Sequence, residues 1–265
     1  MLKELGDYSV AGSAPQQKGS DLVDLYEKFF RVEEATTPEL KDLAYRIRYQ
    51  VYCVENPFED PTDNLGGLET DRYDDRSATS VLFHRPTGLA AGTVRIVLSN
   101  PTNPQCSFAL QDVCRDPAIR REDRFPVRMT GEISRFCVTK DFRRRVEDMP
   151  LKYLPANGVI DEAEWRRVIP NMTLGLIEWL VRFSVRQGLT HWCAVMEPRL
   201  LRLLARLGIY FEPIGGLVEY HGKRQPCFAE LTSLLDRVER ERPDVWDVIA
   251  ARGRHRDALR EKDVI

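Results

Sequence analysis

Alternating apolar and polar residues predict strands along much of the chain. Apolar runs at 78–84 and 89–98 are joined by Arg85-Pro86-Thr87-Gly88, a turn sequence typical of a β-hairpin. A third run, GEISRFCV, begins at residue 131 and predicts a strand that ends near residue 139. Further runs at 190–196 and within 209–231 predict a buried strand and then two more strands.

A helical spacing of apolar residues predicts helices before, between and after these strands. The pattern covers 21–35, 39–55, 171–187, 198–208 and a charged stretch from residue 234 that is broken at Pro243. Thr37 followed by Pro38 is a helix start, whereas Asn171 is a candidate cap and Gly188 a helix stop. The order of elements predicts an α/β sandwich with a mixed sheet, because strand-helix-strand units favour parallel pairing.

The chain divides into one large domain and two terminal segments. We expect 1–36 to be a flexible arm with a helix, 37–231 the folded domain, and 232–265 a charged helical tail. Within the domain, the mixed sequence at 146–170 predicts an insertion or a lid.

Composition excludes several classes of protein. The 265 residues are 43% hydrophobic, which is enough for a globular core. Because 39 basic residues nearly balance 41 acidic ones, we expect no nucleic-acid partner. No run approaches the roughly 18 to 20 apolar residues of a membrane span, and no signal peptide is recognisable. Six scattered cysteines without metal-ligand spacing predict free thiols, no metal, and a cytoplasmic location.

The predicted buried strands carry charged residues. Strand periodicity places Arg95 on the same face as Thr93 and Val97. Glu132 and Arg135 are three residues apart, so regular alternation would send them to opposite faces unless a bulge reunites them. An unpaired buried charge costs several kcal/mol, so these groups must find partners or face a wet site.

Candidate partners for these charges lie on the first core helix and in an acidic loop: Arg48, Asp71 and Asp74. Two interpretations stay open, namely an internal network of salt bridges and a functional site, where perturbed ionisable groups gather. The acidic run lacks the glycine and final glutamate of a calcium loop, and the four histidines have no ligand spacing. The basic cluster Arg143, Arg144 and Arg145 is either a solvated turn or a contact for phosphate or an acidic protein.

Four motifs, YRIRYQVY, ETDRYDD, GTVRIV and GEISRF, together resemble the acyl-homoserine lactone (autoinducer) synthases, a branch of the GNAT acyltransferase fold. The matching positions are Arg48, Tyr52, Phe58, Asp71, Asp74, Arg95, Glu132 and Arg135. The resemblance is best over about 40–140 and implies a GNAT-like three-layer sandwich, with a mixed, largely antiparallel sheet flanked by helices. It also implies a bulge in the fold's fourth strand.

The chain also departs from the autoinducer synthases. Phe58 stands where that family has tryptophan, the insertion at 146–170 is large, and both terminal segments are long. In these features it is more similar to PEP-CTERM/exosortase-associated acyltransferases and long-chain N-acyl amino acid synthases. The resemblance therefore implies transfer of an acyl group from a thioester on acyl carrier protein, or coenzyme A, to the amine of an amino acid or similar acceptor.

These relatives imply roles for the candidate residues, with no bound cofactor. Glu132 is the expected general base, Arg95 and Arg135 hold the acceptor's carboxylate or orient Glu132, and backbone N–H groups near 136–138 stabilise the oxyanion. The acceptor pocket is framed by Arg48, Tyr52, Phe58, Asp71 and Asp74. Arg143, Arg144 and Arg145 face the donor, and candidates for the acyl slot are Met172, Leu176, Trp179, Trp192 and Val195.

Three alternatives remain. A lactone synthase using S-adenosylmethionine would share the same motifs. A coenzyme A-dependent acetyltransferase is disfavoured, because KDFRRRVEDMP replaces the glycine-rich Q/R-x-x-G-x-G/A turn after the strand. A non-catalytic protein that binds acyl chains or acyl carrier protein would have no need of Glu132.

Overall fold

The structure is a computed structural model that describes residues 22–148 and 162–260. Its centre is a sheet with the order β1-β2-β3-β4-β5-β8-β6, and β7 pairs with β8. The strands are β1 Phe30–Glu34, β2 Ser77–His84, β3 Ala90–Val97, β4 Thr130–Val138, β5 His191–Met196, β6 Glu212–Pro213, β7 Val218–Glu219 and β8 Lys223–Glu230. The β4–β5 pair is parallel and the other pairs are antiparallel, so the predicted mixed, largely antiparallel sheet is confirmed.

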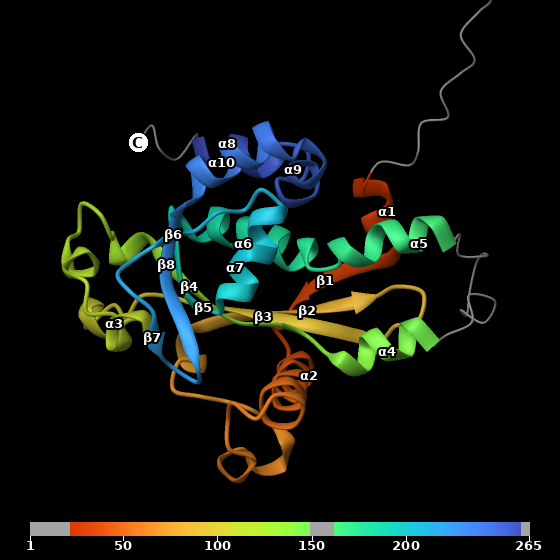
Figure 1. The fold of residues 1–265 in the computed structure, drawn as a ribbon, viewed down its shortest axis with the longest axis horizontal. Helices are drawn as coiled ribbons and strands as arrows, with labels where there is room; N and C mark the ends of the chain where they lie inside the picture. The colour runs from red at the N-terminus through yellow and green to blue at the C-terminus, as the bar shows by residue number, and fades with distance from the viewer. Residues whose placement is uncertain (1–21, 149–161, 261–265) are drawn as a thin grey trace, which may run out of the picture.

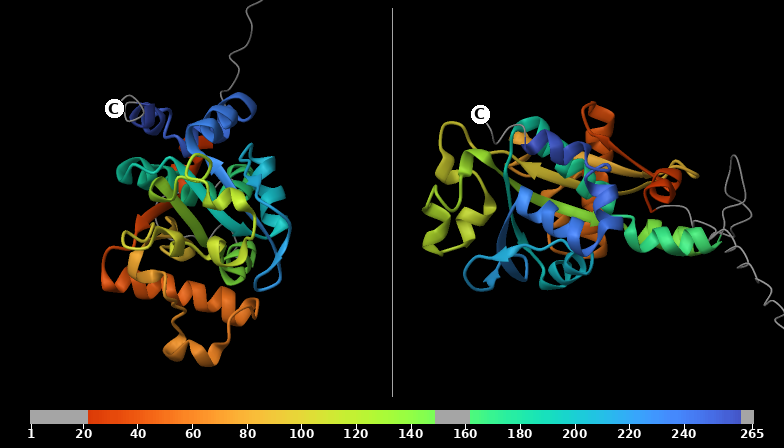
Figure 2. Two further views of the ribbon diagram at one scale, coloured as in Figure 1. Left: turned by 90° about the vertical axis from the view of Figure 1, so that its left-hand side faces the viewer. Right: turned by 90° about the horizontal axis from the view of Figure 1, so that it is seen from above.

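Helices cover both faces of this sheet, as the predicted sandwich requires. They are α1 Leu22–Phe29, α2 Pro38–Tyr49, α3 Ala109–Val113, α4 Lys140–Asp148, α5 Glu162–Val168, α6 Leu174–Gln187, α7 Pro198–Arg206, α8 Leu231–Glu241, α9 Pro243–Ile249 and α10 Arg254–Arg260. Figure 1 shows α2 below the sheet and α6, α7 and the last three helices above it. The two side views of Figure 2 show the same layers.

The predicted helix at 21–35 is wrong in its second half. The helix ends at Phe29, and Phe30–Glu34 form the edge strand β1, in which Phe30 pairs with His84 and Val32 with Leu82. The sequence FRVEE alternates apolar and charged residues, a strand pattern that the longer helical reading obscured. Pairing with β2 satisfies backbone groups that would otherwise remain unpartnered at the edge of the hairpin.

Helix termini follow the sequence in two of three places. Thr37 Oγ1 accepts a hydrogen bond from the Leu40 N–H at 3.3 Å, and Gly188 ends α6 with φ +71°. Asn171, however, is not the cap of α6. It belongs to a 3₁₀ turn, its side chain donates to the Arg167 carbonyl, and Thr173 stands at the start of the helix instead.

The bulge predicted in this strand is present, but it lies at Arg135 and Phe136, just after the segment between Glu132 and Arg135. On β3, Thr93 and Arg95 are two residues apart, yet their partners on β4, Cys137 and Ser134, are three apart. Arg135 has φ +52°, a left-handed conformation that is rare for a residue with a side chain. The extra residue turns the Arg135 side chain toward the α2 side of the sheet, where Glu132 also lies.

Strands β4 and β5 pair only along one short stretch. Pairing runs from Thr130↔His191 to Glu132↔Cys193, whereas β4 continues to Val138 and β5 to Met196. Beyond Glu132 the two strands therefore diverge, and a gap opens in the middle of the sheet.

The predicted terminal segments pack on the sheet domain where they are described. In the tail, Val245 and Ile249 of α9 are buried in the same apolar core as α1 and α6. Trp165 of α5, from the predicted insertion, packs against Phe29 and the His84 ring. The rest of that insertion, at 149–161, lies outside the described residues, as do 1–21 of the predicted arm.

In the described ranges, no single helix has the length and apolar character needed to cross a membrane. One bent pair, Ala163–Asn171 with Leu174–Gln187, meets that test by length and composition.

Candidate active site

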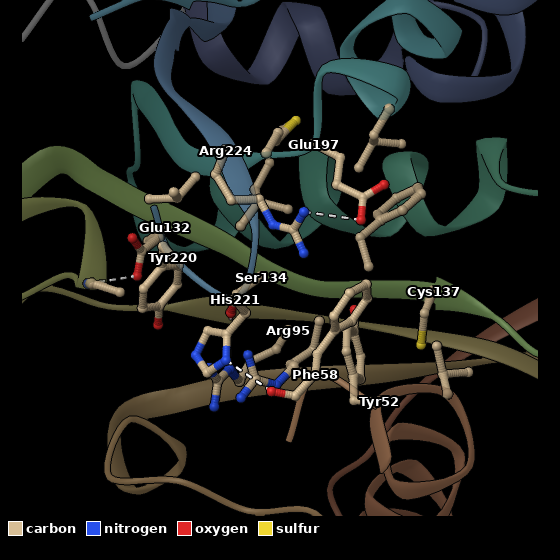
Figure 3. A pocket seen from close by; sticks show the side chains of 18 of the residues that line it. Tyr52, Phe58, Arg95, Glu132, Ser134, Cys137, Glu197, Tyr220, His221 and Arg224 are labelled. Carbon is tan, nitrogen blue, oxygen red and sulfur yellow. Dashed lines mark hydrogen bonds and ion pairs between the residues drawn. The ribbon is translucent and has the colours of Figure 1, made fainter. Parts of the chain in front are cut away.

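A cavity of about 320 Å³ occupies the gap between β4 and β5 (Figure 3). Because the gap connects the two faces of the sheet, the cavity has two kinds of wall. Its polar wall includes Tyr52, Phe58, Arg95, Glu132 and Tyr220. Its apolar wall includes Ile177, Leu180, Trp192, Leu204, Ile209 and Phe211. A molecule with a polar head and an aliphatic tail fits such a space.

Glu132 lies at the last residue pair before the strands separate. It is only 2% exposed, and its carboxylate accepts hydrogen bonds from the N–H groups of Ala109 at 3.0 Å and Leu110 at 2.8 Å. Burial raises the Glu132 pKa to about 7, although these two N–H groups and the charge of Arg95 act in the opposite direction. The carboxyl group is therefore poised to exchange a proton near neutral pH.

The N–H donors for Glu132 come from the start of the short helix α3. Phe108 and Leu110 anchor this segment in a second apolar cluster, and Phe108 makes an edge-to-face contact with Phe125 at 6.2 Å between ring centroids. The Gln111 side chain accepts the N–H groups of Ser107 and Phe108, which holds the chain as it enters the helix. The sequence gives no signal for this helix, because its five residues are too few for an apolar spacing to repeat.

Seven charged side chains beside Glu132 form what we call the acid–arginine cluster: Arg48, Arg95, Arg135, Glu59, Glu69, Asp71 and Asp74. Arg48, fully buried on α2, contacts Glu69 and makes two bonds to Asp74 at 2.7 and 3.0 Å. Arg95 on β3 makes two bonds to Asp71 at 2.6 and 2.9 Å, one to Asp74 and one to the Ser134 hydroxyl.

Arg135, which the bulge directs into the same cluster, contacts three carboxylates. Its Nη2 lies 2.7 Å from Glu69, 3.0 Å from Glu59 and 3.2 Å from Asp71. Its guanidinium group also lies over the Tyr52 ring at 5.2 Å. The structure thus brings together all the predicted charged residues of the polar side, and pairs the arginines with carboxylates.

The carboxylates of the cluster are held in the ionised state. Burial raises the pKa of Glu69, but its bonds and charge pairs with Arg135 and Arg48 outweigh burial and bring that pKa to about 2. Burial also raises the pKa of Asp74, but its hydrogen bonds and charge pairs with Arg48 and Arg95 outweigh burial and bring this pKa to about 2. These groups therefore keep their charge throughout the neutral range.

Sequence reasoning missed Glu69, which is 1% exposed and joins Arg48 to Arg135. A count of the charges predicted to be buried would have pointed to Glu69. Three arginines predicted to be buried need more than the two selected aspartates, and Glu69 opens the same motif, ETDRYDD. Also missed were Arg224 and His221, which come from the far end of the chain and carry no local signal.

Tyr52 and Phe58 line the polar wall, as expected of acceptor-pocket residues. The predicted helix at 39–55 changes at Gln50 into a π-helical turn, Gln50–Glu55, which carries Tyr52. The Phe58 N–H donates to the Tyr52 carbonyl at 2.9 Å, and the two rings lie 6.4 Å apart. His221 donates from Nδ1 to the Phe58 carbonyl at 2.9 Å and so ties this loop to the opposite side of the cavity.

Two of the five predicted acyl-slot residues, Trp192 and Val195, line the cavity. The other three, Met172, Leu176 and Trp179, lie in the core outside the described lining, and Trp179 donates to Glu34. The cavity-facing residues of α6 are instead Ile177 and Leu180. The helix was placed correctly, but its orientation about its own axis cannot be predicted from apolar spacing when it is buried on more than one side.

The predicted donor-side arginines lie on α4, directly after β4. Arg143, Arg144 and Arg145 are exposed, and the first two line a surface groove with Gln50 and Val54. At the start of this helix, the Lys140 N–H donates to both Glu55 carboxylate oxygens at 3.0 Å. A carboxylate of the protein therefore occupies a helix N-terminus that would otherwise be open to an anion.

Within 22–148 and 162–260, no group of three or more His, Cys, Asp or Glu side chains has the arrangement of a metal site. Burial lowers the pKa of His84 to about 4, and this histidine packs among aromatic rings away from the cavity. Cys137 and Cys193 are buried, and burial raises the pKa of both thiols, Cys137 to about 12.

Comparison with known proteins supports the GNAT-like fold that the sequence predicts. Residues 47–151 match the family described as acetyltransferase (GNAT) domain. No curated protein matches the chain. The structure of TofI in a ternary complex with an inhibitor and MTA aligns with a TM-score of 0.53 at 18% identity, over 79% of this chain and 96% of TofI.

Two further structures are similar. A CoA-dependent acyl-homoserine lactone synthase, BjaI, with MTA, aligns with a TM-score of 0.50 at 16% identity, over 89% of this chain and 99% of BjaI. FeeM, an N-acyl amino acid synthase from uncultured soil microbes, aligns with a TM-score of 0.47 at 12% identity, over 78% of this chain and 94% of FeeM. Together with the diverging strands, the family match over 47–151 and the TofI alignment show that this chain has a GNAT-like fold.

Proposed function

We propose that the protein is an N-acyltransferase that moves a long-chain acyl group from a thioester on acyl carrier protein to the amine of an amino acid. The observation that carries this proposal is the position of Glu132. A buried carboxyl with a pKa near neutrality stands where the strands part, between a polar wall and an apolar wall of one cavity.

Glu132 acts as the general base. A free amino acid is mostly ammonium at neutral pH, so the amine must lose a proton, directly or through water, before it can attack. The nitrogen then forms a bond to the thioester carbon, and the carbonyl oxygen becomes an oxyanion. When the intermediate collapses, the nitrogen loses a second proton, the C–S bond breaks and the pantetheine thiolate leaves. One of the two protons released by the nitrogen protonates the thiolate and the other passes to water, which gives the thiol and the amide.

Backbone N–H groups of β4 stabilise the oxyanion. N–H groups along a strand point alternately to its two sides, and the Thr139 N–H donates toward β3, to Ala91. The N–H group of Val138, one residue earlier in the strand, therefore points away from β3 and toward the gap. A backbone donor at a gap in a sheet is suited to a charge that develops during the reaction.

The acyl chain enters the apolar part of the cavity, between α6 and α7. Carrier protein, which is acidic, docks on the exposed arginines of α4. Two features favour carrier protein over coenzyme A: the glycine-rich turn is absent, and the Lys140 N–H is bound to Glu55. In this proposal the enzyme works in the cytoplasm and is a relative of the PEP-CTERM/exosortase-associated acyltransferases.

The acid–arginine cluster, with Tyr52 and Phe58, holds the acceptor loop in place. Its arginines are engaged with carboxylates, which supports a scaffold role for Arg95 and Arg135 rather than capture of the acceptor's carboxylate.

The test is incubation of the full chain with long-chain acyl carrier protein and the twenty amino acids, with products identified by mass spectrometry. We expect an acyl amino acid that disappears with Glu132→Gln. Parallel reactions contain acyl-coenzyme A or S-adenosylmethionine. An acyl lactone formed only with S-adenosylmethionine would replace this proposal by the lactone-synthase alternative, and absence of any product would favour a binding protein.

A further inference from the structure

We propose that Arg224 binds the carboxylate of the acceptor and so selects α-amino acids over simple amines. The inference rests on the proposed function, because it names the chemistry of the acceptor at the same site. It arises from a difference among the three guanidinium groups that line the cavity: Arg95, Arg135 and Arg224.

Arg95 and Arg135 are poor receptors for another carboxylate. Arg95 already makes bonds to two aspartates and Arg135 to three carboxylates. The cluster holds four carboxylates against three guanidinium groups, which leaves one formal negative charge. An incoming carboxylate would be repelled there, whereas the ammonium group of an amino acid would be attracted.

Arg224 is in a different position. It lies at the start of β8, beside Phe58 in the cavity lining, and its side chain is 13% exposed. Figure 3 shows its guanidinium group between Glu197 and Phe58. Among the residues that the structure describes, its carboxylate contact is with Glu197, at 3.0 Å, and the Glu197 side chain is 40% exposed. That partner is therefore close to solvent and can be displaced at small cost.

The Phe58 ring packs against the guanidinium group of Arg224. The Arg224 carbon Cζ lies 5.0 Å from the centre of this ring, a cation–π contact. A cation–π contact uses no N–H donor of the guanidinium group, so these donors stay available for a bidentate contact with a carboxylate. The Phe58 carbonyl is itself fixed by His221, so this wall is held from both sides.

Arg224 and the acidic cluster together orient an amino acid. The acidic cluster and Glu132 attract the ammonium group, and Arg224 attracts the carboxylate. This arrangement directs the amine toward the group that removes its proton. Amines without a carboxylate would lack the second contact and bind less well.

The experiment compares wild type, Arg224→Gln and Arg224→Lys. The acceptors are the amino acid that reacts best and the amine obtained by removing its carboxylate, for example L-tyrosine and tyramine. We expect Arg224→Gln to raise the KM for the amino acid about 10- to 100-fold, and to leave the KM for the amine within about 3-fold. Arg224→Lys, which keeps the charge but loses the fork, should give an intermediate KM.

Two further variants control this result. Arg202→Gln removes an exposed positive charge from neighbouring α7, outside the cavity lining, and should change neither KM. Glu197→Gln removes the competing carboxylate and should lower the KM for the amino acid about 3- to 10-fold. An equal loss with both acceptors in Arg224→Gln would mean that Arg224 only maintains the wall, which overturns the inference.

Calorimetric binding of the same two acceptors separates this inference from the proposed function. If wild type acylates tyramine and tyrosine with equal KM, the inference fails and the proposed function stands. If no acyl transfer occurs but the amino acid binds and Arg224→Gln weakens it, the carboxylate site stands and the proposed function fails. If the amino acid binds equally to both proteins, the inference is overturned.

Discussion

Glu69 and Glu132 are the same residue type, almost equally buried at 1% and 2% exposed, and yet their pKa values are displaced in opposite directions. Glu69 faces two guanidinium groups, whereas Glu132 faces two backbone N–H groups. Full positive charges compensate for the loss of water, and N–H dipoles do so only in part. The hydrogen-bond and charge partners, rather than burial, thus determine the two pKa values. Glu69 stays an anion that stabilises the fold, whereas Glu132 can take up a proton near neutral pH.

The two regions also differ in what they connect. The acid–arginine cluster joins α2, β3 and bulged β4 to the loop from Glu59 to Asp74. Glu132 joins β4 only to the start of α3 and otherwise borders the cavity. We therefore expect mutations in the cluster to change stability first, and mutation of Glu132 to change activity first.

The largest expected effect is the loss of activity in Glu132→Gln. Removal of a general base should reduce kcat by about 10²- to 10⁴-fold, because the amide of glutamine cannot accept the proton. The measurement is the initial rate of acyl amino acid formation, with circular dichroism to confirm that the variant is folded. A folded variant that retains more than one tenth of wild-type kcat would contradict the role of Glu132.

Arg48→Met should cost about 3 to 5 kcal/mol of unfolding free energy, because it leaves Glu69 and Asp74 buried without their shared partner. Urea denaturation measures this loss. Arg46→Met, at an exposed position on the same helix, is the matched control and should stay within about 0.5 kcal/mol of wild type. Equal effects of the two variants would mean that the cluster does not hold the loop.

A smaller effect concerns the pH dependence of stability. The Glu132 pKa is raised from an ordinary 4.5 to about 7, so the folded protein binds this proton more tightly than the unfolded chain does. Its contribution, roughly 3 kcal/mol, is fully present below pH 4.5 and is lost as pH rises through about 7. Burial lowers the pKa of His84 to about 4, so His84 contributes in the opposite direction over part of this range, but it does so equally in both proteins. Urea denaturation between pH 5 and 8 should therefore show that the stability of wild type falls relative to that of Glu132→Gln.

Glu69 and Asp74 act in a separate pH window. Their pKa values are lowered to about 2, so their contribution is present above the ordinary carboxyl pKa and is lost as pH falls through about 2. A decline of equal size in wild type and Glu132→Gln between pH 5 and 8 would have to come from another group, and would contradict the contrast between the two glutamates.

Local chemistry made much of this fold predictable. The hairpin turn, the Thr37 cap, the Gly188 stop and the bulge in β4 each follow from rules that act over a few residues. Parity showed that two charges three residues apart reach one face of a strand only if an extra residue intervenes, and the family resemblance predicted that bulge in the fourth strand.

What could not be predicted depends on contacts between distant segments. Strand β1 forms by pairing with the edge of β2. Glu132 accepts hydrogen bonds from a helix whose five residues are too few for an apolar spacing to repeat. The cavity-facing residues Ile177 and Leu180 depend on how α6 rotates over the sheet. Arg224 reaches the site only through the pairing of β5 with β8.

The most direct test of the account is ¹³C NMR of the side-chain carboxyl carbons in protein labelled at glutamate, titrated from pH 4 to 9. We predict one glutamate signal with a midpoint near pH 7 that is missing in Glu132→Gln, and a Glu69 signal that does not move over this range. If no glutamate titrates above pH 5, or if the signal near pH 7 persists in Glu132→Gln, Glu132 is not the poised base.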